Sequence, residues 1–224
     1  MQLQKSKKIL IYFFLFFIIG SINNKNLNSL YLPKINEIYV YGLHDKKNLE
    51  LEKNLNHLKL KNIFFLDSEE IKSILKKNNL IEKYSIFKRY PASLEIKIIQ
   101  TSFLAYTKID TELFLLGSNG KYIKTDNKEY DIPFIFGNFS SEDFLNLKNT
   151  IEDSEFDLDE IRNFYSFKSG RWDIETRSNI LIKLPEKNIS KSLNMSLDIL
   201  NNDNKKIINQ LDLRQNNQII VNGK

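Results

Sequence analysis

The sequence predicts an α+β protein in which a short apolar segment at the N-terminus precedes two small domains. Three observations predict this class. An unbroken apolar run follows a lysine-rich start. Residues 35–102 then show the order strand, helix, helix, strand, strand. From residue 103 to the end of the 224-residue chain, short strand patterns and turns alternate with amphipathic helical stretches, which is typical of a mixed, mostly antiparallel sheet with flanking helices.

The N-terminal segment has the composition of a membrane signal. Three lysines in residues 5–8 precede the apolar run 9–19, whose insertion into a bilayer is favourable by about 3–6 kcal/mol. As a helix, residues 9–22 span only about 21 Å, against about 30 Å of hydrocarbon. Two interpretations are open: an uncleaved anchor and a cleaved secretory signal. We favour the anchor, because residues 20–23 match the small-residue pattern of a cleavage site poorly.

The position of the lysines also predicts the topology. Basic residues before an apolar segment favour a cytoplasmic N-terminus, with everything after the segment exported. The sequence therefore predicts a single-pass protein. Its predicted organisation is a cytoplasmic tail (1–8), a transmembrane helix (9–22), a linker (23–34), a first domain (35–102) and a second domain (103–224).

In the first domain, capping residues mark the start of each predicted helix. A strand pattern in residues 35–42 comes first, and Asp45 is predicted to cap a helix whose leucines recur at i, i+4 and i+7. A short apolar bridge, residues 63–66, leads to the second helix. There, Asp67 and Glu70 form a capping box, in which Asp67 accepts from the amide three residues on and Glu70 reaches back.

Two strands complete the first domain. The apolar residues Ile81 and Tyr84 are out of phase by one position, which predicts a β-bulge between them. Residues 90–92 form a turn around Pro91, and apolar and charged residues then alternate over 94–98.

The second domain is predicted mainly from turn signals. Residues 117–120, Gly-Ser-Asn-Gly, are a strong hairpin signal because Asn-Gly suits positive φ. Ser140 or Ser141 is predicted to cap a helix, and a hairpin turns near Asn179. The remaining predicted elements are a Pro-broken strand (132–137), a helix carrying Leu193, Leu197 and Leu200, and two strands (211–214 and 218–221).

The composition excludes several kinds of chemistry. Because there is no cysteine, the chain has no disulfides, thiolate metal sites or thiol nucleophiles. His44 and His57 have no second histidine or carboxylates at ligand spacing, and no Gly-x-Ser-x-Gly motif occurs. The net charge of +5 comes from scattered lysines, without a basic stripe interleaved with aromatic residues. We therefore predict no catalytic, cofactor-binding or metal-binding residues, and neither a nucleic acid nor a small-molecule substrate as a partner.

The last predicted strand, Gln218–Val221, is the segment with functional content. It is short, apolar and without proline, and only Lys224 guards it. Edge strands expose a row of unpaired amides and carbonyls, which proteins normally block with charge, proline or bulges. Two interpretations are open: the strand simply completes the sheet, or a partner adds a strand to it by β-augmentation.

The order of the elements and a set of short motifs resemble the FtsQ/DivIB family of bacterial cell-division proteins, most closely its alphaproteobacterial branch. The first domain resembles a POTRA domain, and the second resembles the β-domain of the family. Besides the N-terminal apolar segment, the motifs are Tyr39–Gly42, Lys88–Ile96, Ile132–Gly137, Arg171–Asp173, Leu184–Glu186 and Leu211–Arg214.

This resemblance implies a non-catalytic scaffold of the division machinery, anchored in the inner membrane with most of the chain in the periplasm. Such a scaffold links early and late division proteins at the septum. It implies capture of FtsB-like and FtsL-like bitopic proteins by strand addition at the C-terminal strand, and a POTRA surface for other division proteins. The alternative, a POTRA-bearing translocation or envelope-assembly factor, requires a barrel after the POTRA domain, for which this chain is too short.

The partner-binding residues that the resemblance implies lie in two places. Gln215 and Gly223 stand where the family carries aromatic contacts, so Asn216, Asn217 and the backbone are expected to carry more of the affinity here. A single tryptophan on a strand is also commonly a core residue. The implied residues are Arg171, Trp172, Gln215, Asn216, Asn217, Gln218, Ile219, Ile220 and Val221.

Overall fold

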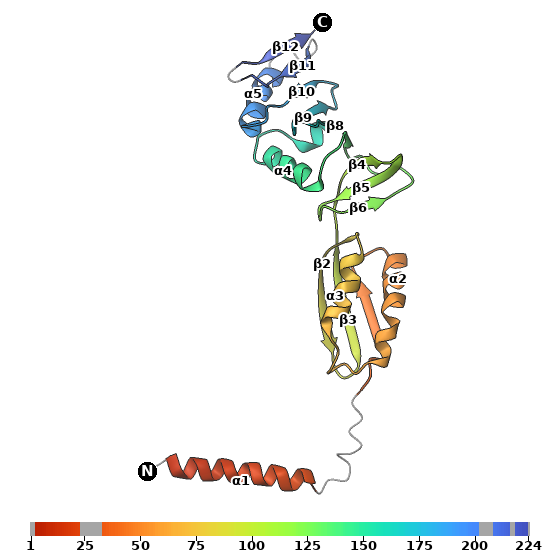
Figure 1. Ribbon diagram of the computed structural model, residues 1–224, viewed down its shortest axis with the longest axis vertical. Helices are drawn as coiled ribbons and strands as arrows, with labels where there is room; N and C mark the ends of the chain where they lie inside the picture. Colours follow the sequence, from red (N-terminus) through yellow and green to blue (C-terminus); the bar gives the residue numbers. More distant parts are fainter. Residues whose placement is uncertain (1–2, 23–32, 202–207, 216–217, 224) are drawn as a thin grey trace.

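The structure, a computed structural model, describes residues 3–22, 33–201, 208–215 and 218–223 (Figure 1). In these residues the chain forms an N-terminal helix, a three-stranded sheet with its helices and a nine-stranded sheet with its helices. The α+β class predicted from the sequence is confirmed.

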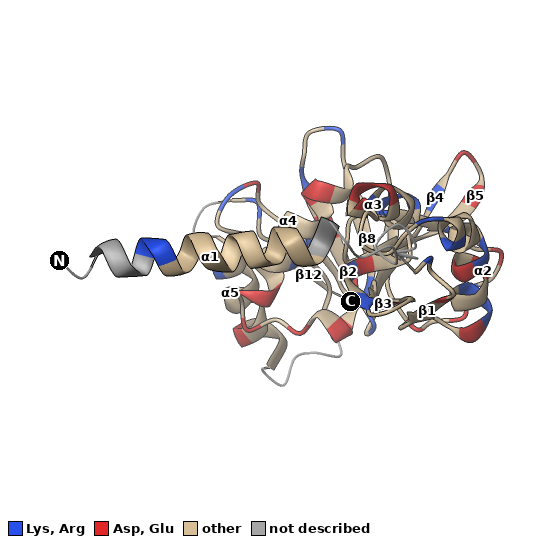
Figure 2. Cartoon of the chain, turned by 90° about the horizontal axis from the view of Figure 1, so that it is seen from below, with Lys and Arg blue, Asp and Glu red and all other residues tan. Residues whose placement is uncertain are grey.

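The N-terminal helix, α1 (Leu3–Ile22), is 20 residues long. It begins earlier than the predicted segment 9–22, because the lysine-containing residues before the apolar run are also helical. Figure 2 shows basic residues near the start of α1 and an uncharged stretch after them. The large apolar side chains between Ile9 and Ile19 are exposed. Across the described ranges, no helix combines the length and the apolarity needed to cross a membrane.

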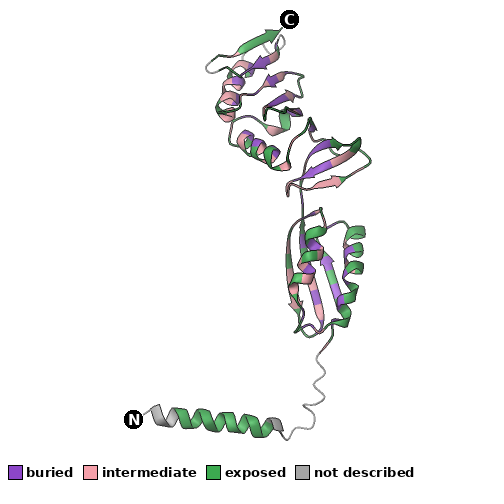
Figure 3. Ribbon diagram, viewed as in Figure 1, coloured by how far each residue is buried: buried purple, intermediate pink, exposed green. Residues whose placement is uncertain are grey.

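The first sheet has the order β1-β3-β2, with β1 parallel and β2 antiparallel to β3. The predicted bulge is confirmed, since the register of β2 shifts between Ile81 and Lys83. Two helices cover one face, and alternate strand residues form a core with them (Figure 3). The elements are β1 (Glu37–Tyr41), α2 (Asp45–Leu55), the 3-10 helix η2 (Asn56–Leu60), α3 (Ser68–Lys77), β2 (Ile81–Arg89) and β3 (Ser93–Gln100).

The helix caps differ in part from those predicted. Asp67 is the N-cap of α3, as predicted, but it accepts from the amide of Glu69 at 2.9 Å, only two residues on. Glu70 does not reach back, because its carboxylate accepts from Lys61 and lies 3.0 Å from His57 Nε2. Asp45 is not a cap: it is the first residue of α2, where its charge still favours the positive end of the helix dipole.

The second sheet has nine strands in the order β12-β11-β10-β9-β8-β7-β4-β5-β6. Three of its pairings are parallel, β4 with β7, β7 with β8 and β10 with β11, so the sheet is mixed but mostly antiparallel. Its strands are β4 (Phe103–Ile109), β5 (Glu112–Gly117), β6 (Tyr122–Lys124), β7 (Phe134–Phe136), β8 (Ile161–Ser166), β9 (Trp172–Thr176), β10 (Leu181–Lys183), β11 (Ile208–Asp212) and β12 (Ile220–Gly223).

Two helices pack on this sheet, α4 (Ser141–Glu152) and α5 (Ile189–Asn201), and η3 (Leu158–Glu160) is a short 3-10 turn before β8. Ser140 caps α4 by accepting from the amide of Asp143 at 3.1 Å, which confirms the predicted cap. The apolar faces of both helices join one core with the central strands. This core holds β9, β10 and β11 in place, and β11 positions the last strand.

The two sheets are joined by a very short connection. Strand β3 ends at Gln100 and β4 begins at Phe103, so only two residues lie between them. The turn between β5 and β6 reaches back across this connection. The side-chain amide of Asn119 in that turn donates to the backbone carbonyls of Asn79 at 2.9 Å and of Ile81 at 3.0 Å.

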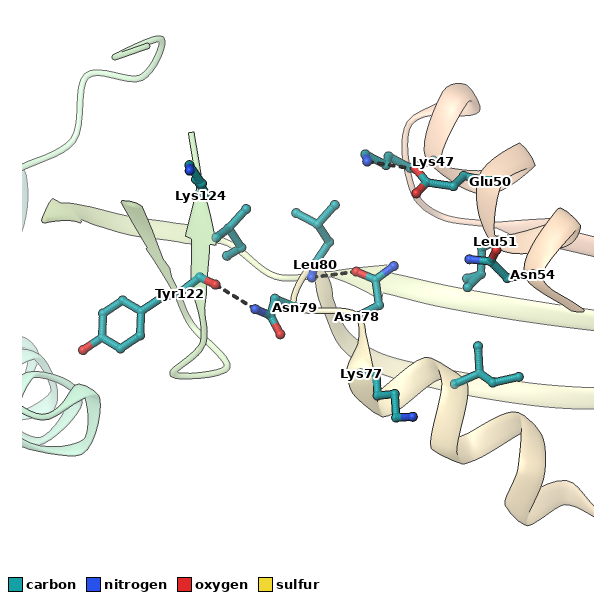
Figure 4. A pocket seen from close by; sticks show the side chains of 12 residues that line it. Lys47, Glu50, Leu51, Asn54, Lys77, Asn78, Asn79, Leu80, Tyr122 and Lys124 are labelled. Atoms are coloured by element: carbon teal, nitrogen blue, oxygen red, sulfur yellow. Dashed lines mark hydrogen bonds and ion pairs between the residues drawn. The ribbon is translucent and has the colours of Figure 1, made fainter. Parts of the chain in front are cut away.

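A second group of polar contacts supports this junction. The carboxylate of Glu82, on β2, accepts from the hydroxyl of Ser118 at 2.8 Å and from that of Thr101 at 3.2 Å. Asn79 donates to the carbonyl of Tyr122 at 2.8 Å beside an open cavity of about 520 Å³ (Figure 4). Hydrogen bonds therefore tie the hairpin of the second unit to the start of β2 in the first.

Candidate partner-binding edge

Strand β12 forms one edge of the nine-stranded sheet. It pairs antiparallel with β11 on one side, with Leu211 opposite Val221 and Asp212 opposite Ile220. Within the described residues, no strand pairs with its other side. All four residues of β12 are exposed, and Ile220 and Val221 are 42% and 45% exposed (Figure 3). An exposed, partly apolar edge of this kind can accept another strand.

The last strand begins two residues later than predicted. The amide of Gln218 donates to the carbonyl of Gln215 at 3.4 Å, so Gln218 still belongs to the turn after β11. The prediction of a strand over residues 218–221 is therefore wrong at its start, and β12 extends to Gly223 instead. Ile219 is partly buried against the core.

The predicted residues of the turn lie beside the edge strand. Gln215, Gln218 and Ile219 line a small cavity of about 60 Å³ with residues from the start of α5. Asn216 and Asn217, which were also predicted to contact a partner, lie outside the described residues. The described part of the predicted segment 215–221 is thus continuous with the exposed edge.

Arg171 and Trp172 do not lie at this edge. They stand at the start of β9, and β10 and β11 separate β9 from β12. Trp172 is only 6% exposed, and its ring centroid lies 5.6 Å from that of Phe139. Arg171 pairs with Asp173 at 3.2 Å. The structure therefore places the indole of Trp172 in the core of the domain.

Sequence reasoning missed a row of charged residues next to the edge. Lys183 on β10 stands opposite Asp173 on β9 and Asp212 on β11, and Asp212 stands opposite Ile220 on the edge strand. The guanidinium of Arg214 donates to Asp212 at 2.8 Å. The sequence signal was the i, i+2 spacing of Asp212 and Arg214, which puts both side chains on one side of an extended segment, here the last residue of β11 and the two residues after it.

The two buried carboxylates of this row have opposite pKa shifts. The hydrogen bond from Arg214 is the main cause that lowers the pKa of Asp212 below its usual value. Burial is the main cause that raises the pKa of Asp173, against the attraction of Arg171. At neutral pH the charged form of Asp212 therefore stabilises the fold, whereas burial makes the charged form of Asp173 costly.

Replacing Asp212 by Asn is expected to lower the free energy of unfolding by about 1–2 kcal/mol at neutral pH, because a charge-assisted hydrogen bond is lost. Since the native pKa of Asp212 is lowered, its contribution is present above the unfolded value of about 3.9 and is lost as the pH falls through the native value. Urea unfolding followed through the fluorescence of Trp172, the single tryptophan, measures this difference.

Asp173→Asn is the matched control for this pH dependence. Because the native pKa of Asp173 is raised, the native chain should gain stability relative to Asp173→Asn as the pH falls. As the pH falls, the stability advantage of the native chain over Asp212→Asn should shrink, whereas its stability relative to Asp173→Asn should rise. If the loss of unfolding free energy in Asp212→Asn is the same at neutral and acidic pH, the role assigned to the Asp212–Arg214 pair is contradicted.

The described histidines and carboxylates do not gather into a metal site. In the ranges that the structure describes, no group of three or more metal-ligating side chains comes together. His57 contacts the carbonyl of Asn54 at 3.0 Å as well as Glu70. The main cause that lowers the pKa of Glu70 is its hydrogen bond from Lys61. These contacts are those of a surface ion-pair network on α3 and its neighbours.

Comparisons with known proteins place both sheets in one family. A family model described as "POTRA domain, FtsQ-type" matches residues 34–99. A second, described as "Cell division protein FtsQ/DivIB, C-terminal", matches residues 105–214. Between them the two matches cover both sheets up to the turn after β11, in the order that the chain has them.

Individual relatives give the same result over most of the chain. The cell division protein FtsQ of Rickettsia typhi (strain ATCC VR-144 / Wilmington) is 29% identical over 197 residues, covering 84% of this chain and 72% of the relative. The FtsQ protein of Rickettsia bellii (strain RML369-C) is 27% identical over 192 residues with the same coverage.

Among solved structures, the major extracytoplasmic domain of DivIB from Geobacillus stearothermophilus aligns with 48% of this chain and 98% of that domain, at 13% identity and a TM-score of 0.34. On the two tandem family matches and the FtsQ relatives, the chain belongs to the FtsQ/DivIB family of cell division proteins.

Proposed function

We propose that this chain is a non-catalytic scaffold of the cell-division machinery, and that it captures a partner by strand addition at β12. One observation carries the proposal: β12 is a sheet edge with exposed residues and a single neighbouring strand among the described residues. An added strand gains main-chain hydrogen bonds along such an edge, while the side chains around it set specificity.

The proposed partners are an FtsB-like bitopic division protein and the FtsL-like protein that accompanies it. The contact region extends from Gln215 to Val221, and the exposed Ile220 and Val221 supply its apolar contacts. Because Gln215 and Gly223 stand where the family resemblance implies aromatic contacts, more of the affinity comes from Asn216, Asn217 and the backbone of β12. Arg171 and Trp172 support the neighbouring strands from within the domain.

The proposal includes an anchor in the inner membrane. The helix α1 carries large exposed apolar side chains over its length after the lysines, and a helix that is apolar all round needs an apolar environment. We propose that residues 9–22 enter the inner membrane with the N-terminus in the cytoplasm. The first domain (35–102) and second domain (103–224) then lie in the periplasm, and the first offers a surface to other division proteins.

Hydrogen exchange of the full chain, with and without the purified FtsB-like partner, tests strand addition directly. The amides of β12 that point away from β11 are expected to exchange at least about tenfold more slowly in the complex, because an added strand accepts hydrogen bonds from them. The opposite edge strand, β6, is the internal control and should not change. Unchanged exchange in β12, or protection of β6 alone, contradicts the proposal.

A further inference from the structure

Several large apolar side chains are exposed at one end of the first domain, the end where the chain coming from α1 enters it. Leu60 and Phe65 are 77% and 78% exposed, and Phe64 and Tyr90 are also exposed. The rings of Phe64 and Tyr90 stack with their centroids 5.0 Å apart, which joins the loop before α3 to the turn between β2 and β3. We call these four residues, Leu60, Phe64, Phe65 and Tyr90, the entry face.

Hydrogen bonds hold the backbone that presents the entry face. The amide of Ile35 donates to the carbonyl of Lys61 at 3.1 Å, and the amide of Asn36 donates to the carbonyl of Ala92 at 2.8 Å. The incoming chain is therefore bonded both to the loop before α3 and to the β2–β3 turn. Four large apolar side chains are therefore exposed on a backbone that is held in place, and exposed apolar side chains gathered at one end of a domain mark an interaction site.

Lysines, together with the exposed carboxylate of Asp67, lie on the segments that carry the patch. Lys34 and Lys59 are exposed on the segments that carry it. The ammonium group of Lys88 donates a hydrogen bond to the carbonyl of Leu66 at 3.0 Å, and this contact does not neutralise the charge of Lys88. Aromatic and leucine side chains next to lysines match the interface of a bilayer that contains anionic lipid, where rings enter the headgroup region and ammonium groups meet phosphates.

The chain itself limits how far this patch can lie from the end of α1. Ile22 and Pro33 are eleven positions apart, so the chain between them spans at most about 40 Å. Figure 1 shows that the chain enters the first domain at the end that carries the β2–β3 turn, and that β12 lies at the far end of the molecule. If α1 is in the membrane, the entry face is the part of the folded domains nearest to it.

We propose that the entry face docks on the bilayer surface, with Phe64, Phe65, Leu60 and Tyr90 in the headgroup region and the nearby lysines on anionic lipids. This inference rests on the proposed anchoring of α1. Docking at this end orients the long axis of the two domains away from the membrane and holds β12 at a distance from it.

The absence of cysteine from the chain makes the test direct, because one introduced cysteine carries a label at one position. Full-length Leu60→Cys and Tyr41→Cys chains, labelled with an environment-sensitive fluorophore, are reconstituted into vesicles of phosphatidylethanolamine and phosphatidylglycerol. Tyr41 is the control because it is also exposed but lies farther from the entry face. It is the last residue of β1, whose first residue, Glu37, lies opposite Ser93 beside the β2–β3 turn. Quenching by lipids that carry a nitroxide near the headgroup should be at least about twofold stronger at 60 than at 41.

A second substitution and a flotation assay separate the possible results. Adding Phe65→Ser to the Leu60→Cys chain should reduce the quenching, because an apolar contact with the bilayer is removed. Chains that do not float with the vesicles contradict the anchoring of α1 and, with it, the docking that rests on that anchor. Chains that float, with equal quenching at 60 and 41, overturn the docking alone. Shielding of position 60 from iodide without lipid quenching also overturns it, since a protein then covers the face.

Discussion

An Ile220→Pro chain is expected to bind the FtsB-like partner at least about tenfold more weakly than the native chain. Proline removes one amide donor from β12, and its ring obstructs the close approach of a neighbouring backbone. Ile220 lies opposite Asp212 at the start of the edge strand, so the change affects the strand that the partner would extend. Titration of the labelled partner into the reconstituted full chain measures the affinity.

Ile220→Thr is the matched control for this prediction. It keeps the backbone amide and a β-branched side chain, and it is expected to retain binding within about threefold because the main-chain hydrogen bonds of strand addition are kept. Both variants should unfold at urea concentrations close to that of the native chain, since β12 contributes no residue to the fully buried core. Native-like affinity in a folded Ile220→Pro chain would falsify strand addition at this position.

Trp172→Ala is expected to lower the free energy of unfolding of the second domain by about 3–5 kcal/mol. The indole is buried, and its centroid lies 6.1 Å from the ring of Phe144 and 6.5 Å from that of Phe164, edge to face with the latter. Truncation removes these contacts and leaves a cavity in the core. Urea unfolding of the detergent-solubilised chain, followed by circular dichroism, measures the loss.

Trp172→Phe distinguishes a core role from a contact role for this residue. It keeps an aromatic ring among the other aromatic side chains and is expected to cost clearly less than the change to alanine. The affinity for the partner, measured where each variant is folded, should stay near the native value. A small change in stability together with a large loss of affinity would show that Trp172 belongs to the interface instead.

Elements with a local signal could be predicted from the sequence. The bulge in β2 followed from two apolar positions out of phase, and the cap of α4 from a serine before an apolar period. Asn179 has φ 63°, the left-handed conformation that asparagine tolerates in a turn, and the hairpin of β9 and β10 turns there as predicted. Each of these depends on a few neighbouring residues.

Features that depend on distant residues could not be predicted. Tyr106 pairs with Phe134 in the parallel contact of β4 with β7, and no residue near either one specifies that partner. Glu70 has the right spacing for a capping box, yet Lys61 and His57, brought close by the fold, engage its carboxylate. The predicted start of the last strand was wrong because Gln218 belongs to the turn after β11. The apolar residues that follow Gln218 made it look like part of the strand.

The two-residue connection between β3 and β4 has a mechanical consequence. A partner held at β12 and a membrane that holds α1 would pull the chain from opposite ends. That tension passes from one sheet to the other through Thr101 and its neighbour, where no slack is available. The bonds of Glu82 with Ser118 and of Asn119 with Ile81 run in parallel with this connection and share the load. If the proposed partner and the proposed anchor are both engaged, the junction would pass the pull from one sheet to the other with little extension.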